Sequence, residues 1–187
     1  MTEGKRKFTG FVALFRGINV GKTKRVEMAR LKSMFESIGC ADVSTYINSG
    51  NVIFASDGKA ENIGNVIAAA LEKEFGFYAE ILIKTRIEMK KIADAIPAGW
   101  RNDSAQRTDV AYLFPEIDSE EILSELPVNM EFIDMRYVKG ALFWNVRREN
   151  YNKSRLNRLI GHRSYQLMTV RNVNTARFLA GCSPDKQ

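Results

Sequence analysis

The sequence predicts an α+β protein made of two ferredoxin-like βαββαβ units in tandem, packed into one compact body. Short apolar segments typical of strands alternate with segments whose apolar residues recur at helical spacing, and this order of elements occurs twice in 187 residues. Several strands carry apolar residues on both faces, so a lone unit would leave an apolar sheet face in water. Two units would bury these faces by packing sheet against sheet or by sharing one continuous sheet.

The first unit is expected over residues 8–84. Its strands are short and apolar, its helices show apolar stripes that end at glycines, and a cluster of turn-forming residues separates the second and third strands. In order, the expected elements are a strand at 11–15, a helix over 28–38 stopped by Gly39, a hairpin of strands at 43–47 and 52–55, a helix over 63–71 closed by Gly76, and a strand at 79–83.

Residues 85–106 are expected to form a connecting helix, ended by Pro97, and a loop. The second unit is expected over 107–181 and repeats the order of elements without convincing residue identity. Its elements are a strand at 110–114, a short helix at 119–125 capped by Asp118 and Glu121, strands at 130–135 and 141–146, a helix at 151–160 stopped by Gly161, a strand at 166–170, and a closing helix at 173–180 capped by Asn172.

Composition fits a folded protein, since 45% of the residues are hydrophobic. Lysine and arginine number 28 and acidic residues 22, which gives a net charge of +6. This excess is modest for a nucleic-acid binder, so its placement is more informative than its size. Positive charge gathers at 16–25 and again at 147–177, whereas 116–131 is acidic.

The chemistry-bearing residues indicate neither a metal nor a cofactor. The two cysteines, Cys40 and Cys182, are far apart and form no CxxC pattern, and His162 is the only histidine. No catalytic constellation is visible, so catalytic residues stay unassigned. The apolar run after residues 1–7 is too short for a signal-peptide core or a membrane span. A cytoplasmic protein without a membrane partner is therefore expected.

Residues 16–25 form a glycine-punctuated basic loop between a strand and a helix, where backbone N–H groups and cations favour anions. The loop is one residue short of the phosphate-loop pattern GxxxxGK[ST], and no strand ending in a magnesium-binding aspartate is evident. Nucleotide hydrolysis is therefore disfavoured, while a looser anion site stays open. Its expected donors are Arg16, Lys22, Lys24 and Arg25. The alternative is a tight turn with a solvated basic face.

Four further residues are candidate ligands for the same anion. Asn19 lies within the basic loop, and Asn48 and Ser49 could present an amide and a hydroxyl from the hairpin turn, although turns select such residues anyway. Arg171 ends an apolar strand and so needs a partner, either a carboxylate or a ligand anion. The duplicated fold predicts that Arg16 and Arg171 come close together.

Four segments carry a resemblance to a known family: FRGINVG at 15–21, VEMARL at 26–31, TYINSGNV at 45–52 and TVRNVNT at 169–175. Together and in this order they resemble the domain-of-unknown-function family 1697, which is widespread and mainly bacterial. The resemblance implies a duplicated ferredoxin-like arrangement and leaves function open. Family members commonly show a second glycine and a proline in the first loop, where this chain has Lys22 and Glu27.

Three functions remain open. The first is binding of a phosphate-bearing partner, either a nucleotide or other small molecule or a nucleic acid, through basic strand-end loops. The second is an enzyme in which Arg16 and Arg171 clamp a small anionic substrate while Ser49, Tyr46 or an acidic residue does the chemistry. The third is a scaffold that docks another protein. The sequence favours binding over catalysis and does not predict the oligomeric state.

Overall fold

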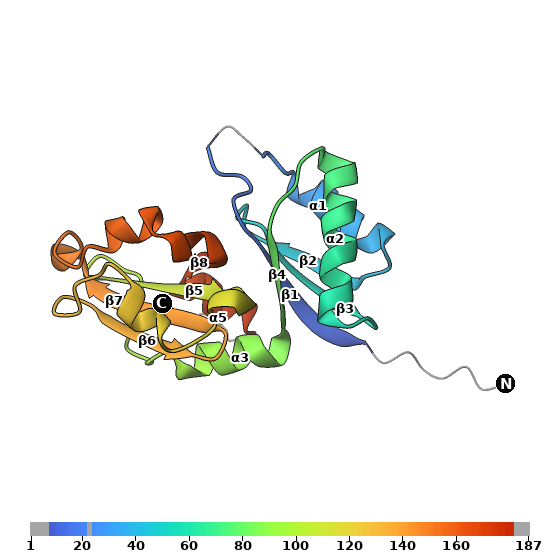
Figure 1. The fold of residues 1–187 in the computed structure, drawn as a ribbon. Coiled ribbons are helices and arrows are strands. Elements are labelled where there is room, and N and C mark those ends of the chain that lie inside the picture. The colour runs from blue at the N-terminus through green and yellow to red at the C-terminus, as the bar shows by residue number, and fades with distance from the viewer. Residues whose placement is uncertain (1–7, 22–23, 182–187) are drawn as a thin grey trace. The chain divides into compact units, whose positions relative to one another are not determined.

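The computed structural model describes residues 8–21 and 24–181 and has a mixed α/β fold. Its contacts divide the chain into two compact units, with the boundary between Arg86 and Ile87 (Figure 1). Each unit contains a four-stranded antiparallel sheet and its own helices. Because the two sheets are separate, the alternative of one continuous sheet is wrong.

The first unit is a sheet with strand order β2-β3-β1-β4 and two helices. Each expected element of this unit is present, with bounds that differ by a few residues. The elements are β1 (Thr9–Phe15), α1 (Met28–Ser37), β2 (Ala41–Tyr46), β3 (Asn51–Ser56), α2 (Ala60–Phe75) and β4 (Ile81–Thr85). Gly76 ends α2 as predicted, and its backbone N–H donates to the carbonyl of Glu72.

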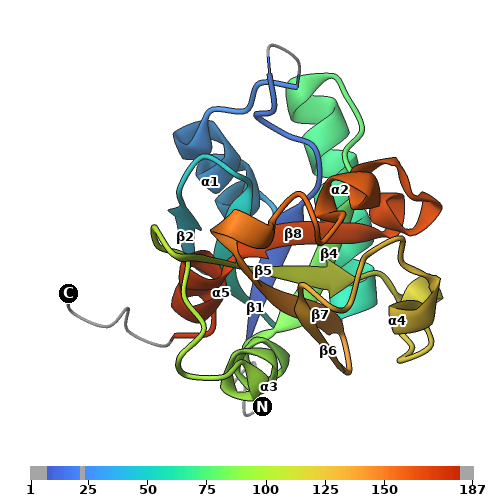
Figure 2. The same ribbon diagram turned by 90° about the vertical axis from the view of Figure 1, so that its left-hand side faces the viewer.

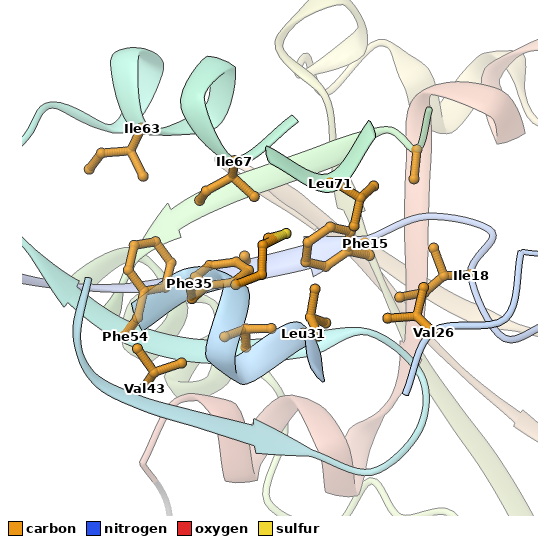
Figure 3. Close-up of a cluster of buried hydrophobic side chains, with 14 of the residues drawn as sticks. Phe15, Ile18, Val26, Leu31, Phe35, Val43, Phe54, Ile63, Ile67 and Leu71 are labelled. Atoms are coloured by element: carbon orange, nitrogen blue, oxygen red, sulfur yellow. The ribbon is translucent and has the colours of Figure 1, made fainter. Parts of the chain in front are cut away.

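The core of the first unit lies between its helices and its sheet (Figure 3). Leu31 and Phe35 reach it from α1 and Ile67 from α2, and all three are fully buried. The Phe35 ring meets those of Phe15 and Phe54 edge to face, with centroids 6.1 Å and 5.1 Å apart. The helical stripes in the sequence therefore mark the faces that this core buries.

The second unit has strand order β6-β7-β5-β8, and Figure 2 shows these four strands one beside the next. Apart from the connecting helix, its helices are shorter than those of the first unit, and several of its connections are 3₁₀ turns. The regular elements are α3 (Arg86–Ala95), β5 (Gln106–Leu113), α4 (Ile122–Glu125), β6 (Asp134–Val138), β7 (Ala141–Arg147), β8 (Met168–Asn172) and α5 (Val173–Leu179). Asn172 caps α5 as predicted, because its Oδ1 accepts from the Thr175 backbone N–H at 2.9 Å.

The prediction of a helix over residues 151–160 is wrong. Residues Arg148–Asn150 and Leu156–Gly161 form 3₁₀ turns, and Arg155 between them has a left-handed backbone (φ 60°) that an α-helix cannot include. The Ser154 hydroxyl donates to the Tyr151 carbonyl at 2.6 Å and competes with regular helix bonds. Leu156 and Leu159 are both buried, and their spacing of three residues suits a 3₁₀ turn as well as a helix.

The strand predicted at 130–135 begins later, since β6 starts at Asp134. Asn129 folds the preceding segment into a turn, with its Oδ1 accepting from the Glu131 N–H at 3.1 Å and its carbonyl accepting from the Phe132 N–H. Pairing with β7 then begins at Asp134 opposite Asn145. The strand predicted at 166–170 likewise begins later, at Met168, after a 3₁₀ turn over Arg163–Leu167.

Asp118 does not cap the short helix α4, although the sequence predicted that role. Its Oδ1 accepts from the Gly140 N–H at 2.8 Å and the Tyr137 hydroxyl at 2.9 Å, and Lys139 lies 3.0 Å from its Oδ2. Burial alone would raise the pKa of Asp118, but these hydrogen bonds hold the pKa below its usual range. The carboxylate therefore fastens the β6–β7 turn.

Asp118→Asn is expected to lower the free energy of unfolding by about 1–2 kcal/mol at pH 7, because it removes charge-assisted hydrogen bonds. A carboxyl whose pKa is lower in the folded chain stabilises it above the unfolded-state pKa of about 3.9. That contribution disappears as pH falls through the folded-state pKa, so the difference between the two proteins should shrink below about pH 4. Urea unfolding of both proteins, followed by tryptophan fluorescence from pH 7 to 3, measures this difference in the free energy of unfolding.

The matched control is Asp134→Asn, which breaks an exposed ion pair with Arg136 and should change stability by less than about 0.5 kcal/mol. A difference between wild type and Asp118→Asn that grows toward low pH would contradict the assignment.

Candidate functional site

The predicted basic loop is held together by Asn19. This residue has a left-handed backbone (φ 55°), which asparagine tolerates better than most side chains. Its Nδ2 donates to the carbonyls of Val26 at 2.9 Å and Asn48 at 3.0 Å, and its Oδ1 accepts from the Val26 N–H at 2.7 Å. The side-chain amide thus ties the loop to the β2–β3 hairpin, which gives Asn19 a structural role.

Two of the predicted cations of this loop have partners within the unit. Arg16 pairs with Glu80 across 3.2 Å, and Lys24 Nζ donates to the Tyr78 carbonyl at 2.9 Å. Lys22 lies outside the described residues. Ser49 is also engaged, because its Oγ accepts from Asn51 Nδ2 at 2.9 Å inside the hairpin turn. These groups stabilise the fold around the loop.

Arg25, one of the cations predicted to bind an anion, lines a cleft of the first unit. It is exposed, and within residues 8–21 and 24–181 it has no hydrogen-bond or ion-pair partner. It lines a cleft of about 530 Å³ together with Asn19, Asn48 and Arg30. Arg30 is held by Glu74, and its guanidinium stacks 5.0 Å over the Phe75 ring. The first unit therefore brings together three predicted residues, Asn19, Arg25 and Asn48, around a mildly basic cleft.

Arg171 lies in the second unit, near the end of β8, and is 9% exposed. Its Nη1 donates to Thr169 Oγ1 at 2.9 Å and to the Val170 carbonyl at 2.8 Å. Burial lowers the pKa of the guanidinium to about 10, and Tyr112 partly opposes that shift. Because Arg16 and Arg171 belong to different units, their proximity stays a prediction.

A cleft of about 460 Å³, here called the arginine cleft, is lined by Arg171 and two further arginines, Arg107 and Arg148. Its other lining residues are Asn102, Asp109, Tyr165, Val170 and Asn172. Strand pairing explains why they meet. The start of β5 carries Arg107 and is antiparallel to both β7 and β8, so it lies beside the ends of those strands, near which Arg148 and Arg171 lie.

The rim of the arginine cleft is fixed by hydrogen bonds. Arg148 donates from Nη2 to Asn102 Oδ1 at 3.1 Å and from Nε to the Asp103 carbonyl. The Asp103 carboxylate accepts from the N–H groups of Gln106 at 2.9 Å and Ala105 at 2.8 Å, which lowers its pKa. The 102–106 loop is thereby attached to the sheet, and Arg148 is positioned before any ligand arrives.

Asp109 is the acidic group of the arginine cleft, and its side chain is 7% exposed. Burial raises the pKa of this carboxyl, although Arg107 opposes the shift through a 2.6 Å hydrogen bond from Nε to Oδ2. Three guanidinium groups thus share the cleft with one carboxylate, which leaves an excess of positive charge. In the described part of the chain, no group of three or more histidine, cysteine or acidic residues is placed to hold a metal ion.

Sequence reasoning found Arg171 but missed Arg107, Arg148 and Asp109. A signal existed for two of them. Arg148 lies within the basic stretch 147–177, and Asp109 is a carboxylate directly before the apolar run at 110–114. No local pattern distinguishes Arg107 from other surface arginines.

Fold and cleft together define an α+β protein of two units, one of which carries a basic hollow at its strand ends. The family model "Protein of unknown function (DUF1697)" matches residues 8–144. The chain therefore belongs to this family, which confirms the resemblance inferred from the sequence. Neither the family description nor the fold assigns an activity.

One solved structure is similar over almost the whole chain. It is that of the conserved bacterial protein SP0830 from Streptococcus pneumoniae, with a TM-score of 0.81, 23% sequence identity, and coverage of 94% of this chain and 99% of that one. At this identity the likeness concerns the fold alone. No curated protein matches the chain. Among the described residues, no helix combines the length and apolar character needed to cross a membrane.

Proposed function

We propose that the protein binds a small phosphate-bearing anion in the arginine cleft of its second unit. The observation that carries this proposal is the set of three arginines, Arg107, Arg148 and Arg171, that line one cleft. Guanidinium is planar, stays charged and donates hydrogen bonds in a fork that matches phosphate oxygens. The burial of Arg171 supports the same reading, since electrostatic attraction is stronger away from water.

A small molecule fits this cleft better than a nucleic acid. The volume of about 460 Å³ lies within the range of about 300–1,000 Å³ typical of small-ligand pockets. A nucleic-acid backbone calls for an extended basic surface, whereas the net charge of +6 is modest and the 116–131 segment of the same unit is acidic. The cleft of the first unit is less favoured, because Arg25 and Arg30 share its lining with the carboxylate of Glu27, whereas the arginine cleft sets three arginines against one carboxylate.

Inorganic phosphate is expected to raise the thermal unfolding temperature of the wild-type protein at constant ionic strength, because a ligand of the folded state stabilises it. Arg148→Gln should weaken phosphate binding about tenfold or more, since it removes a charge-assisted hydrogen bond. Arg148 is exposed, so the substitution costs little core packing; it removes the ligand contact together with the hydrogen bonds to Asn102 and Asp103 that fix the rim of the cleft. Melting curves over a phosphate series give the apparent affinity of each protein.

The control is Arg25→Gln, which removes the exposed arginine of the other cleft and should leave phosphate binding unchanged. Weaker binding in Arg25→Gln with normal binding in Arg148→Gln would move the site to the first unit. Tighter binding of a single-stranded oligonucleotide than of phosphate, lost in the Arg148 variant, would replace the small molecule by a nucleic acid.

We also propose that both units are ferredoxin-like and arose by duplication. The support is the strand order, since in each sheet the first and third strands of the unit are central and the fourth lies at an edge beside the first. The two units differ in one element. Where the first unit has the helix α2, the second unit has 3₁₀ turns. A crystal structure with another strand order in either sheet would contradict the proposal.

A further inference from the structure

Two asparagines line the arginine cleft beside its arginines, and the oxygen of each side chain is already engaged. Asn172 Oδ1 accepts from the Thr175 N–H at 2.9 Å, and Asn102 Oδ1 accepts from Arg148 Nη2 at 3.1 Å. Because both partners can only donate, they fix which branch of each amide is the oxygen. The nitrogen Nδ2 is therefore the polar atom of each side chain that is left for a ligand.

Three donor groups of the cleft are unoccupied. Within residues 8–21 and 24–181, the Nδ2 atoms of Asn102 and Asn172 and the Nη1 atom of Arg148 have no hydrogen-bond partner. Both asparagines are half-buried. The three groups come from three separate segments of the chain, namely the 102–106 loop, the turn after β7 and the end of β8. A ligand in the cleft therefore meets donors from several sides.

The cleft offers few acceptors in return. Its one carboxylate, that of Asp109, is faced by Arg107 Nε at 2.6 Å and by the Trp144 indole, and both oppose the rise in the pKa of Asp109 that burial causes. The oxygens of Asn102 and Asn172 are occupied as well. A ligand that suits this lining is rich in acceptors and needs few donors of its own.

Two kinds of phosphate ester differ in what they offer to such a site. A monoester has three terminal oxygens and, above its second pKa of about 6, close to two negative charges. A diester, such as the internal phosphate of a nucleic acid, has two terminal oxygens and one charge. Donors that come from three segments can each meet a terminal oxygen of a monoester. With a diester, one of them would face an ester oxygen, which is a weaker acceptor.

The charge of the cleft favours the same kind of ester. Three arginines and one carboxylate leave two positive charges in excess, and the dianion of a monoester neutralises both. The volume of about 460 Å³ accommodates a small ester of either kind. Selection between them would therefore arise from hydrogen bonding and charge rather than from space.

We infer that the ligand is a phosphate monoester bound as its dianion, with the Nδ2 atoms of Asn102 and Asn172 and the Nη1 atom of Arg148 donating to its terminal oxygens. This inference rests on the proposed function, since it names the ligand class of the same site. The shared chemistry is a terminal phosphate on a small molecule, which a free sugar phosphate and a mononucleotide both carry.

Calorimetric titration of the full chain with methyl phosphate and dimethyl phosphate, at pH 8 and constant ionic strength, tests the inference. Wild type should bind methyl phosphate about tenfold or more tightly than dimethyl phosphate, since the diester lacks one charge and one terminal oxygen. Ribose 5-phosphate and adenosine monophosphate are further monoesters. The tighter of the two shows whether the source is a free sugar phosphate or a nucleotide, and weaker binding of both than of dimethyl phosphate would overturn the inference.

Asn172→Ser tests the contribution of an amide nitrogen. Serine also caps helices well, so the variant keeps the cap of α5 while it loses Nδ2, and its melting temperature without ligand checks this. Methyl phosphate should bind about fivefold more weakly, while the affinity for dimethyl phosphate changes little. Asn172→Asp also keeps a capping oxygen but puts a negative charge in place of the donor, so it should weaken methyl phosphate binding further.

The matched controls replace Asn129, whose Oδ1 also accepts from a backbone N–H, that of Glu131, and which does not line the arginine cleft. Asn129→Ser and Asn129→Asp should keep the wild-type affinities for both esters. If the Asn129 and Asn172 variants lose methyl phosphate affinity equally, the assigned contact is overturned, because the loss would then not depend on the cleft.

The two proposals fail in different ways. If neither inorganic phosphate nor methyl phosphate binds wild type, the proposed function is wrong and the inference falls with it. If both bind but dimethyl phosphate binds as tightly as methyl phosphate, the inference is overturned while the anion site stands. The same holds if Asn172→Ser folds normally and keeps the full preference for the monoester.

Discussion

Replacing Phe35 by alanine is expected to lower the free energy of unfolding of the first unit by about 3–5 kcal/mol. Phe35 is fully buried, and its ring contacts Phe15 from β1 and Phe54 from β3 edge to face (Figure 3). The substitution removes apolar burial and two aromatic contacts, and it leaves a cavity that close-packed neighbours fill only in part. Few single changes in this unit should have a larger effect.

The measurement must report on the first unit. Both tryptophans, Trp100 and Trp144, lie in the second unit, so indole fluorescence does not follow the region around Phe35. Urea unfolding by circular dichroism, with amide hydrogen exchange in β1 and β3, locates the loss. Phe8→Ala is the matched control, because Phe8 is 45% exposed and should cost less than about 1 kcal/mol. Equal losses in the two variants would contradict this account of the core.

The elements of the first unit were predictable because local signals and tertiary packing agree there. In α2 the apolar stripe coincides with buried Ile63, Ile67 and Leu71, and Gly76 ends the helix. The 151–160 segment gives no such agreement. Its buried leucines are three residues apart, which both α and 3₁₀ geometry allow, and the left-handed Arg155 carries no sequence signal.

The candidate site was less predictable, because partners far along the chain determine whether a polar side chain can bind a ligand or is paired within the protein. Arg16 looks available in the sequence, yet its carboxylate partner Glu80 is 64 residues away. Arg171 could be singled out because a charge within an apolar strand is a local anomaly. Arg107 and Arg148 join it only through the pairing of β5 with β7 and β8, and that pairing is a property of the fold.

Gly50→Ala is expected to lower the free energy of unfolding by about 2–5 kcal/mol, the second large effect in this unit. Gly50 has a φ of +72°, where a side chain costs about 1–2 kcal/mol. An added Cβ would lie 2.7 Å from Phe15 Cβ and 2.7 Å from Ile18 Cδ1, and such overpacking typically costs about 1–3 kcal/mol. The Gly50 carbonyl accepts from the Phe15 N–H at 2.9 Å, so the turn cannot move aside without losing that bond.

Gly17→Ala separates the two contributions, because Gly17 has the same φ of +72° and an added Cβ there meets nothing within 4 Å. It should therefore show only the backbone cost of about 1–2 kcal/mol. Urea unfolding by circular dichroism compares the two variants, and a larger loss in Gly50→Ala measures the clash with Phe15 and Ile18. Equal losses would mean that the hairpin turn shifts freely. In that case, the packing of Gly50 against Phe15 and Ile18 would not be the contact that holds Asn19 and Arg25 in place.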